Sequence, residues 1–470
     1  MSNTKYELSL FIFRRDLRLE DNNGLIAALK SSVQVIPCFI FDPRQLSDNP
    51  YLGKNALQFM LSSLTELDNE LRSQGSHLYC FAGRAEEVIN KLLSELKISA
   101  VYLNRDYTKF SRERDAAIAE TCQSKNVHFL TYSDYLLTEP EDVYTGKRTP
   151  YTVYTHFLKK ASTIPVPQPQ TNNYRNYYTV EVQHEARNPL HEILPIADKN
   201  EKIYLDGGRQ NALEVISTIE QFTGYSQTRD FPAMDSTTGL SPHLKFGTIS
   251  IRELYHCISA KLNKSHPLVR QLYWRDFFCH IAWHFPHIFG QSFNKKYDHL
   301  VWENDDTKFA AWCNGTTGYP IVDAGMRQLS TTGFMHNRVR MITASFLVKD
   351  LHIDWRWGEQ YFAQKLIDYD PAVNNGNWQW AASTGCDAQP YFRIFNPWIQ
   401  GKKFDPECTY IKKWVSELRQ YSTKEIQNLE KGGTLLGYPE PIVSHTQAKI
   451  YAEQMFRDCD SPGCYMQFPG

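Results

Sequence analysis

The chain has 470 residues, of which 42% are hydrophobic, and its 51 Lys and Arg against 52 Asp and Glu give a formal net charge of −1. This length exceeds one ordinary domain, and the apolar content is enough for large cores, so a disordered chain is excluded. The balanced charge excludes a uniformly basic nucleic-acid binder but leaves room for a local basic patch.

The cysteines and the N-terminus bear on the compartment. The ten cysteines are scattered without a CxxC pair, and only Cys459 and Cys464 lie close together in sequence. This pattern is typical of a reducing compartment and argues against a disulfide scaffold or a zinc site, so we expect no metal. The N-terminus has no long apolar segment, and no apolar run reaches the ~18 residues of a membrane span. We therefore expect a cytoplasmic protein without a membrane partner.

The first 135 residues alternate between strand-like and helix-like segments. Apolar runs of strand length lie at 8–13, 34–41, 77–81, 100–103 and 127–132. Helical patterns lie between them at 55–72, 85–98 and 109–124. This alternation predicts a doubly wound parallel sheet in an α/β domain, 1–135. No G-x-G-x-x-G follows the first strand, so the usual dinucleotide fingerprint is missing.

The rest of the chain divides into a connector, a helical domain and a short tail. Residues 136–208 lose periodicity and include a stretch rich in Pro, Asn, Gln and Tyr, which predicts an interdomain connector. Helical patterns dominate 209–457 and predict an all-α domain, followed by a tail at 458–470. All ten tryptophans lie between Trp274 and Trp414. A Trp-rich core and an aromatic-lined site both account for this distribution.

Two segments of the helical domain have residues that suit a phosphate. The stretch "TTGLSPHLKFG", 237–247, places hydroxyl and backbone N–H groups at a helix start, although an ordinary Ser-Pro N-cap is the simpler reading. In "HNRVRM", the guanidinium group of Arg338 has the fork geometry that binds phosphate. Considered alone, this arginine is equally typical of a solvent-exposed helix face.

The segment "DYDPAVNNGNWQW", 368–380, is an unusual helix start. Asp370 and Pro371 fit the N-cap and the first helical position, yet Gly and Asn, which follow, are poor helix formers. Asn374 and Trp378 are four residues apart and share a helical face. Two carboxylates, an amide and an indole at a helix start suit a polar heteroaromatic ring, and a capped helix with core tryptophans is the alternative.

Long motifs give the chain a family resemblance. They are "FRRDLRLEDN", "RTPYTVYTHF", "RDFPAMDSTTGLSPHLKFG", "YWRDFF", "TGYPIVDAGMRQL", "MHNRVRMITASFLVKDL" and "IDWRWGEQYFAQKLIDYDPAVNNGNWQWAASTGCDAQPYFRIFNP", with "GKKFD" after the last. From about residue 8 to 457 the chain resembles the photolyase/cryptochrome family, with its closest likeness to class I cyclobutane pyrimidine dimer (CPD) photolyases. The resemblance implies an α/β domain and a helical domain that binds FAD.

The resemblance assigns roles around the flavin, which works as the reduced anion. Asn374 would lie near flavin N5, and Trp378 would begin an electron-transfer chain through Trp355 to Trp302. The implied catalytic residues are Trp302, Trp355, Trp378, Asn374 and Gln271. The implied FAD-binding residues are Tyr225, Thr237, Thr238, Gly239, Leu240, Ser241, Asp368, Tyr369, Asp370 and Asn374.

The implied activity is light-driven DNA repair, in which the flavin donates an electron to a flipped dimer and splits it. A damaged pair is weakly stacked, so flipping costs only a few kcal/mol. The expected partner is UV-damaged DNA, and we expect a monomer. The implied DNA contacts are Arg229, Gln271, Trp274, Arg275, Phe278, Asn337, Arg338, Met341, Trp380 and Gln400. A basic rim for phosphates would consist of Arg229, Arg275, Arg338, Lys402 and Lys403.

Gln271 departs from the class I pattern. Those enzymes have a glutamate before "LxWR", and glutamine at that position is associated with (6-4) photolyases. The (6-4) branch has two histidines where this chain has Asn337 and Met341, so the dimer remains the expected substrate. The alternatives are a (6-4) enzyme and a cryptochrome-type photoreceptor, which often has a long C-terminal extension. A flavoprotein that uses NAD(P)H is disfavoured by the missing glycine fingerprint.

The resemblance also implies a place for a light-harvesting chromophore in the N-terminal domain. Asp106 and Lys245 match positions that provide polar contacts in deazaflavin-binding members. An arginine expected near "PYLGKNA" is not evident. Methenyltetrahydrofolate, a deazaflavin and no antenna all remain open.

Overall fold

The computed structural model describes residues 5–47, 49–183, 185, 199–234 and 236–460. The chain forms two compact units that alternate along the sequence. The first unit comprises 1–201, 205–223 and 238–284, and the second comprises 202–204, 224–237 and 285–470. Helices from the start of the expected helical domain belong to the unit that contains the sheet. The predicted domain boundaries remain predictions. Only 458–460 of the predicted tail, and most of the predicted connector, lie within the described residues.

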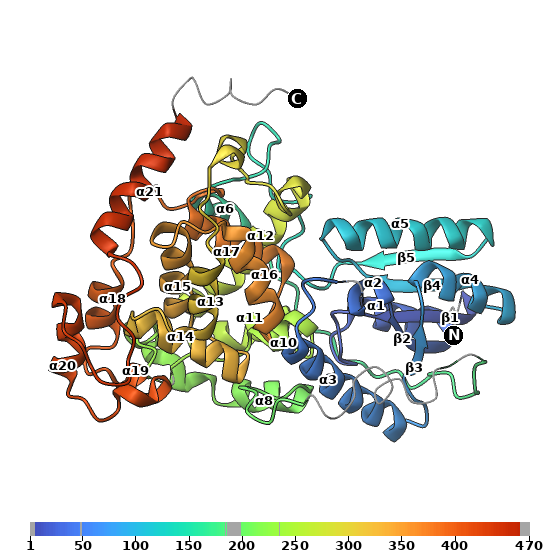
Figure 1. Ribbon diagram of the computed structural model, residues 1–470. Coiled ribbons are helices and arrows are strands. Elements are labelled where there is room, and N and C mark those ends of the chain that lie inside the picture. Colours follow the sequence, from blue (N-terminus) through green and yellow to red (C-terminus); the bar gives the residue numbers. More distant parts are fainter. Residues whose placement is uncertain (1–4, 48, 184, 186–198, 235, 461–470) are drawn as a thin grey trace. The chain divides into compact units, whose positions relative to one another are not determined.

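The first unit is built on a parallel sheet of five strands in the order β3-β2-β1-β4-β5 (Figure 1). The strands are β1 (Tyr6–Phe13), β2 (Ser32–Phe41), β3 (Tyr79–Ala82), β4 (Ala100–Asn104) and β5 (His128–Tyr132). Each lies at a predicted apolar run, so the doubly wound α/β prediction is confirmed. The chain order reverses direction between β1 and β4, which is where such sheets bind ligands at the carboxyl ends of their strands.

Alternate residues of the strands form separate cores on the two faces of the sheet. Phe11 and Phe13 of β1 belong to the core that includes side chains of α1 (Asn23–Ser31) and α3 (Lys54–Ser73). Leu10 and Ile12 belong to the core formed with α4 (Ala85–Glu95) and α5 (Lys109–Ser124). The period of two therefore places helices on both faces. The other α-helices among the described residues of this unit are α2 (Pro43–Leu46), α6 (Tyr154–Ala161), α8 (Arg209–Ser217), α10 (Ser241–Phe246), α11 (Ile251–Lys261) and α12 (Pro267–His284).

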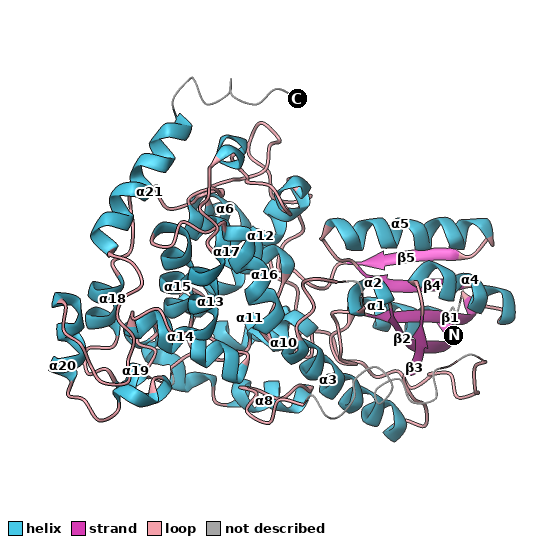
Figure 2. Cartoon of the chain, viewed as in Figure 1, coloured by secondary structure: helices cyan, strands magenta, loops and turns pink. Residues whose placement is uncertain are grey.

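The second unit is helical throughout its regular structure (Figure 2). Its helices are α9 (Tyr225–Thr228), α13 (Asp306–Asn314), α14 (Pro320–Thr332), α15 (Asn337–Lys349), α16 (Trp355–Lys365), α17 (Pro371–Ala382), α18 (Pro397–Phe404), α19 (Thr409–Trp414), α20 (Thr423–Asn428) and α21 (His445–Asp460). One core joins α13 to α17, with Trp312, Trp355 and Trp378 almost fully buried in it. The predicted Trp-rich core is therefore present. No helix among the described residues is long and apolar enough to cross a membrane.

Candidate functional site

Helix α17 begins as its sequence predicts. Asp370 is the N-cap, and its carboxylate accepts a hydrogen bond of 3.0 Å from the Val373 N–H. Pro371 occupies the first helical position, where a missing N–H costs nothing. The cap holds the weak Asn-Asn-Gly-Asn turn in a helix.

Two amides of α17 tie down the loop 288–293. Asn375 donates to the Ile288 carbonyl at 3.1 Å, and Gln379 donates to the same carbonyl at 3.2 Å. The Gln379 amide oxygen accepts from the Phe293 N–H at 2.7 Å. This role was not predicted from the sequence, although Asn375 and Gln379 have the spacing of four that marks one helical face. These polar residues are part of the scaffold that fixes the neighbouring face.

The neighbouring face carries Asn374 and Trp378. Asn374 is 8% exposed and donates to the Glu359 carbonyl at 3.0 Å, while the Trp378 ring is 2% exposed. A Cβ atom at Gly358 would lie 2.1 Å from Cη2 of Trp378, so glycine is required there for α16 and α17 to pack. The amide and the indole are held in fixed positions within the helical unit.

Asp368 extends this polar group towards α15. Its side chain is 6% exposed and pairs with the Arg340 guanidinium at 3.0 Å, while Arg340 also donates to the Met335 carbonyl at 2.7 Å. Arg340 was not among the predicted site residues. The segment 368–374 therefore supplies two carboxylates and an amide, with a fixed guanidinium beside the first of them.

The other predicted FAD contacts fall in two places. Tyr225 and Thr237 belong to the helical unit, where burial raises the pKa of the Tyr225 phenol and the Asp230 carboxylate adds to the rise. Thr238 to Ser241 belong to the first unit; Gly239 has φ 64°, and the Leu240 N–H donates to the Thr238 hydroxyl at 3.4 Å. The Ser-Pro N-cap interpretation is wrong, because Leu240 is the N-cap of α10 and no side chain caps this helix.

The three tryptophans of the implied electron chain differ in their surroundings. Trp355 is fully buried, and its indole N–H has no hydrogen-bond acceptor among the described residues. Trp302 is partly buried, with its ring centroid 6.4 Å from that of Phe456. Within the described part of the chain, no ring contact joins Trp355 to Trp378 or Trp302. The chain of the three remains a prediction.

Three segments that carry predicted DNA contacts meet in the helical unit. Arg338 pairs with Asp230 at 2.9 Å, next to Arg229, and its guanidinium lies 4.4 Å from the ring centre of Phe404. The Lys403 ammonium lies over the same ring at 5.1 Å. Positive groups distant in sequence therefore gather around Phe404. The predicted contacts Asn337, Met341, Trp380 and Gln400 are all exposed or partly exposed.

Helix α12 of the first unit carries the other predicted DNA contacts. Trp274 stacks on Tyr154 with 3.5 Å between ring centroids, and the Gln271 amide makes no hydrogen bond within the described residues. Arg275 instead donates to the Tyr135 carbonyl at 2.7 Å and stacks on the Tyr135 ring. Phe278 is 3% exposed and stacks on Trp274. Arg275 and Phe278 therefore have internal packing contacts, and their contact with DNA remains a prediction.

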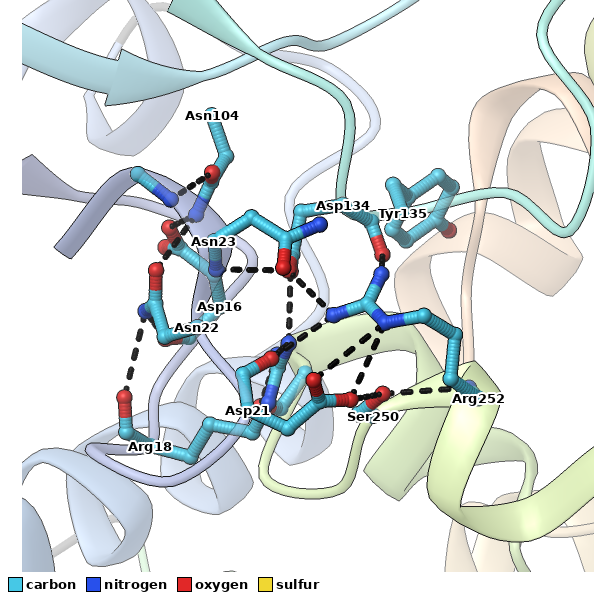
Figure 3. A network of polar contacts seen from close by, with 12 residues as sticks. Asp16, Arg18, Asp21, Asn22, Asn23, Asn104, Asp134, Tyr135, Ser250 and Arg252 are labelled. Carbon is cyan, nitrogen blue, oxygen red and sulfur yellow. Dashed lines mark hydrogen bonds and ion pairs between the residues drawn. The ribbon is translucent and has the colours of Figure 1, made fainter. Parts of the chain in front are cut away.

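A buried charge network holds α11 against the strand ends of the first unit (Figure 3). Asp134, after β5, accepts from Arg18 at 2.7 Å and from Arg252 at 2.8 Å. Arg252 also pairs with Asp21 at 3.0 Å. Burial by itself would raise the pKa of Asp134, but the two guanidinium groups outweigh it and hold that pKa below its usual value.

Next to this network, a recess lies at the carboxyl ends of β1, β4 and β5. Its lining includes Arg14, Arg15, Asp106 and Tyr135. Arg15 donates to Asp106 at 3.2 Å and to the Lys245 carbonyl at 3.4 Å, so the two predicted antenna residues share a partner. Burial favours the neutral form of Asp106, yet Arg15, Arg14, Arg114 and Lys245 together hold its pKa well below the usual value.

Comparison with known proteins decides what these two units are. Residues 9–171 match the family described as DNA photolyase, and 268–458 match the FAD binding domain of DNA photolyase. The deoxyribodipyrimidine photo-lyase of a Synechococcus species is 39% identical over 455 residues, which covers 93% of both chains. The chain belongs to the DNA photolyase family.

Solved structures of photolyases and a cryptochrome share the whole fold. The Sulfolobus tokodaii photolyase, whose crystal structure holds two FAD molecules, is 45% identical with a TM-score of 0.88 and covers 96% of this chain and all of its own. The class III photolyase of Agrobacterium tumefaciens is 35% identical with a TM-score of 0.90 and covers 97% of this chain and 98% of its own. A Synechocystis cryptochrome is 28% identical with a TM-score of 0.87 and covers 97% and 100%.

The residues present fit the flavin that the family implies. Asp368 and Asp370 would accept hydrogen bonds from a flavin, Arg340 would donate one, and the buried Asn374 amide is held by the Glu359 carbonyl. A flavin ring edge has both donors and acceptors, so this mixed set matches it. The chain is a flavoprotein of the photolyase type, and the predicted family, fold and cofactor are confirmed.

Proposed function

We propose that the protein repairs cyclobutane pyrimidine dimers in UV-damaged DNA with light. The observation that carries the proposal is the group formed by Asp368, Asp370, Asn374 and Trp378 in a flavin-binding family domain. When bound, reduced FAD supplies an electron donor that light makes strong enough to split the dimer. A cytoplasmic monomer that meets its substrate on DNA fits this role.

The chain's own residues would bind and orient the substrate. Arg229, Arg338 and Lys403 would neutralise phosphates. Trp274 stacks on Tyr154 but is partly exposed, so the open part of its ring would contact a flipped base. Asn337 and Met341 contact each other at 3.8 Å, where a (6-4) enzyme would need two histidines. This pair supports the dimer as the substrate.

Two oligonucleotides test the proposal, one with a single cyclobutane dimer and one with a single (6-4) lesion. Under blue light the reduced protein should restore the first and leave the second unchanged, and neither should change in the dark. Affinity for the dimer should fall as salt rises, because phosphates are contacted. Repair of the (6-4) lesion, or affinity indifferent to salt, would refute this assignment. A light-induced conformational change without repair would favour the cryptochrome-type alternative.

A second chromophore is supported by the recess at the strand ends. Its position at the reversal point of a doubly wound sheet is where such folds bind nucleotides. Arg15, Arg14 and Lys245 would offset an anionic group there. Purified protein should take up one further equivalent of FAD, a deazaflavin or methenyltetrahydrofolate, and Arg15→Ala should abolish that uptake while leaving the first FAD bound. Unchanged uptake by the variant would place the chromophore elsewhere.

A further inference from the structure

Trp378 belongs to an aromatic cluster that has no ring contact with Trp355 among the described residues. The Trp378 ring centroid lies 4.9 Å from that of Phe362 and 6.2 Å from that of Trp312. Phe362 and Trp312 stack at 5.9 Å with an interplanar angle of 11°. Phe362 therefore bridges two tryptophans that already contact each other, and all three rings are at most 3% exposed.

The same cluster continues to a tryptophan that is only partly buried. Phe309 stacks on Trp312 at 5.9 Å and meets Trp357 edge-on at 5.2 Å. Trp357 lies on α16, two residues after Trp355, and it has intermediate exposure. A continuous set of ring contacts thus runs from Trp378 through Trp312 to an indole that solvent reaches.

The surroundings of Trp312 stabilise a positive charge on its indole ring better than the surroundings of Trp355 stabilise one on the Trp355 ring. An indole that loses an electron becomes a stronger N–H donor, so a fixed acceptor stabilises the oxidised form. The Trp312 N–H donates to the Thr343 carbonyl at 3.1 Å. The Trp355 N–H is buried with no such acceptor among the described residues.

We propose that Trp312 and Trp357 form a second route for electrons to Trp378, in addition to the chain through Trp355. This inference rests on the proposed function and on the role that the family resemblance gives Trp378, which is to give one electron to the photoexcited oxidised flavin. Trp312 then returns an electron to Trp378, and Trp357 returns one to Trp312. Oxidised Trp357 releases its indole proton to water and becomes a neutral indolyl radical, and an external thiol restores it by giving up a hydrogen atom and becoming a thiyl radical. Phe309 and Phe362 fill the gaps and are not themselves oxidised.

The first experiment compares photoreduction of bound FAD, with a thiol present, in single and double variants. The Trp378→Phe variant should show no photoreduction. In the Trp355→Phe variant, photoreduction should remain more than about tenfold faster than in Trp378→Phe. Adding Trp312→Phe or Trp357→Phe to Trp355→Phe should remove the photoreduction that remains in the Trp355→Phe variant. Trp398→Phe is the matched control, because it removes an indole of the same unit that lies on neither route.

A second readout does not depend on photoreduction yield. Transient absorption should show a tryptophan radical in Trp355→Phe, and mass spectrometry after illumination should find oxidation at Trp357 in that variant. Trp357 is partly exposed, so Trp357→Phe tests the route even if Trp312→Phe fails to fold.

The outcomes separate the route from the proposed function. If Trp355→Phe is blocked as fully as Trp378→Phe and Trp357 stays unoxidised, the second route is refuted and the proposed function stands. If Trp378→Phe photoreduces normally, Trp378 is not the entry point and the second route is refuted with it, whereas dimer repair by the reduced protein is unaffected.

Discussion

Gln271 is the residue at which the site departs from the class I repair enzymes that the chain resembles. Its amide has no hydrogen-bond partner among the described residues, so it is available to a substrate. It can donate a hydrogen bond to a carbonyl on which negative charge develops, but unlike a neutral acid it cannot donate a proton.

Gln271→Glu should raise repair per absorbed photon by less than about tenfold, the factor that corresponds to about 1.36 kcal/mol. The gain is small because the hydrogen bond is already present and only the proton is added. FAD content and affinity for damaged DNA should barely change. Gln271→Ala, measured alongside, should lower both repair and affinity because the dimer carbonyls lose a partner. Loss of repair in Gln271→Glu would reopen the (6-4) and photoreceptor alternatives.

Asp230 limits the charge that Arg338 can offer to a phosphate. The pair is partly exposed, so it contributes little to stability and can be broken. Asp230→Asn should tighten binding of dimer-containing DNA by about twofold to tenfold, or about 0.4–1.4 kcal/mol. It should also steepen the dependence of affinity on salt.

Asp306→Asn provides the control for Asp230→Asn. Asp306 is exposed in the first turn of α13, so the variant changes the net charge equally without touching Arg338. Equal tightening in both variants, measured by fluorescence anisotropy, would assign the effect to net charge instead of Arg338.

At the scale of elements, α12 is fixed to the chain after β5 by one buried carboxylate. Asp276 is fully buried and accepts from the N–H groups of Leu137 and Thr138 at 2.8 and 3.1 Å. Burial raises the pKa of Asp276 to about 7, against the lowering effects of Arg275 and of these two N–H groups. The folded protein therefore holds this proton at pH values where the unfolded chain has released it.

The sign of the resulting pH dependence follows from linkage. Between about pH 4 and 7 the folded state binds one more proton, so the contribution of Asp276 to stability falls by up to about 1.36 kcal/mol per pH unit as pH rises. Asp276→Asn should thus gain stability relative to the native chain between pH 5 and 8, as measured by urea unfolding. Asp142→Asn, at an exposed position, should run parallel to the native chain. A parallel curve for Asp276→Asn would show that the carboxyl titrates normally.

Lys349 ends α15 with a buried amine. It is 1% exposed, has no hydrogen-bond partner among the described residues, and lies 3.4 Å from the centre of the Phe456 ring on α21. Burial lowers the pKa of this amine well below its usual value, so the charged form is disfavoured in the folded protein relative to the unfolded chain. The amine therefore destabilises the fold at neutral pH.

Lys349→Met should stabilise the helical unit by about 1–4 kcal/mol at pH 7, as apolar replacement of other buried charges does. The difference in unfolding free energy between Lys349→Met and the native chain should shrink by up to about 1.36 kcal/mol for each pH unit towards 10.5. The reason is that the unfolded native chain loses its Lys349 proton as pH rises, which makes the folded native chain more stable. Urea unfolding at pH 7 and 9 tests this, with the exposed Lys413→Met as control. A constant or negative difference would mean that Lys349 stays charged and that the Phe456 ring stabilises it.

The elements show how far the sequence could predict the structure. Strands such as β1 were predictable because Leu10 and Ile12 alternate with Phe11 and Phe13, and both sets are buried. The cap at Asp370 was predictable because it depends on four adjacent residues. The positions of Arg275 and Phe278 were not, since their partners Tyr135 and Trp274 are set by packing, and Trp312 had no local signal that distinguished it from a core tryptophan.

At the scale of the whole molecule, sequence order and compact units do not coincide. Residues 224–237 pack with the second unit and 238–284 with the first, so the two compact units are interleaved along the chain, and the predicted boundary at 208 remains a prediction. Composition also conceals the charge pattern, since a net charge of −1 coexists with the positive groups of Arg338 and Lys403 around Phe404. Function here follows from local groups of residues and not from totals.

The measurement that tests the central claim most directly is the action spectrum of dimer loss. Purified, reduced protein would be illuminated at a series of wavelengths with an oligonucleotide that carries one cyclobutane dimer, and the loss per incident photon would be measured by chromatography. We predict that the spectrum follows the absorption of the bound chromophores, with no loss in the dark. Dimer loss in the dark, or an illuminated protein that binds the dimer and leaves it intact at every wavelength, would contradict the account.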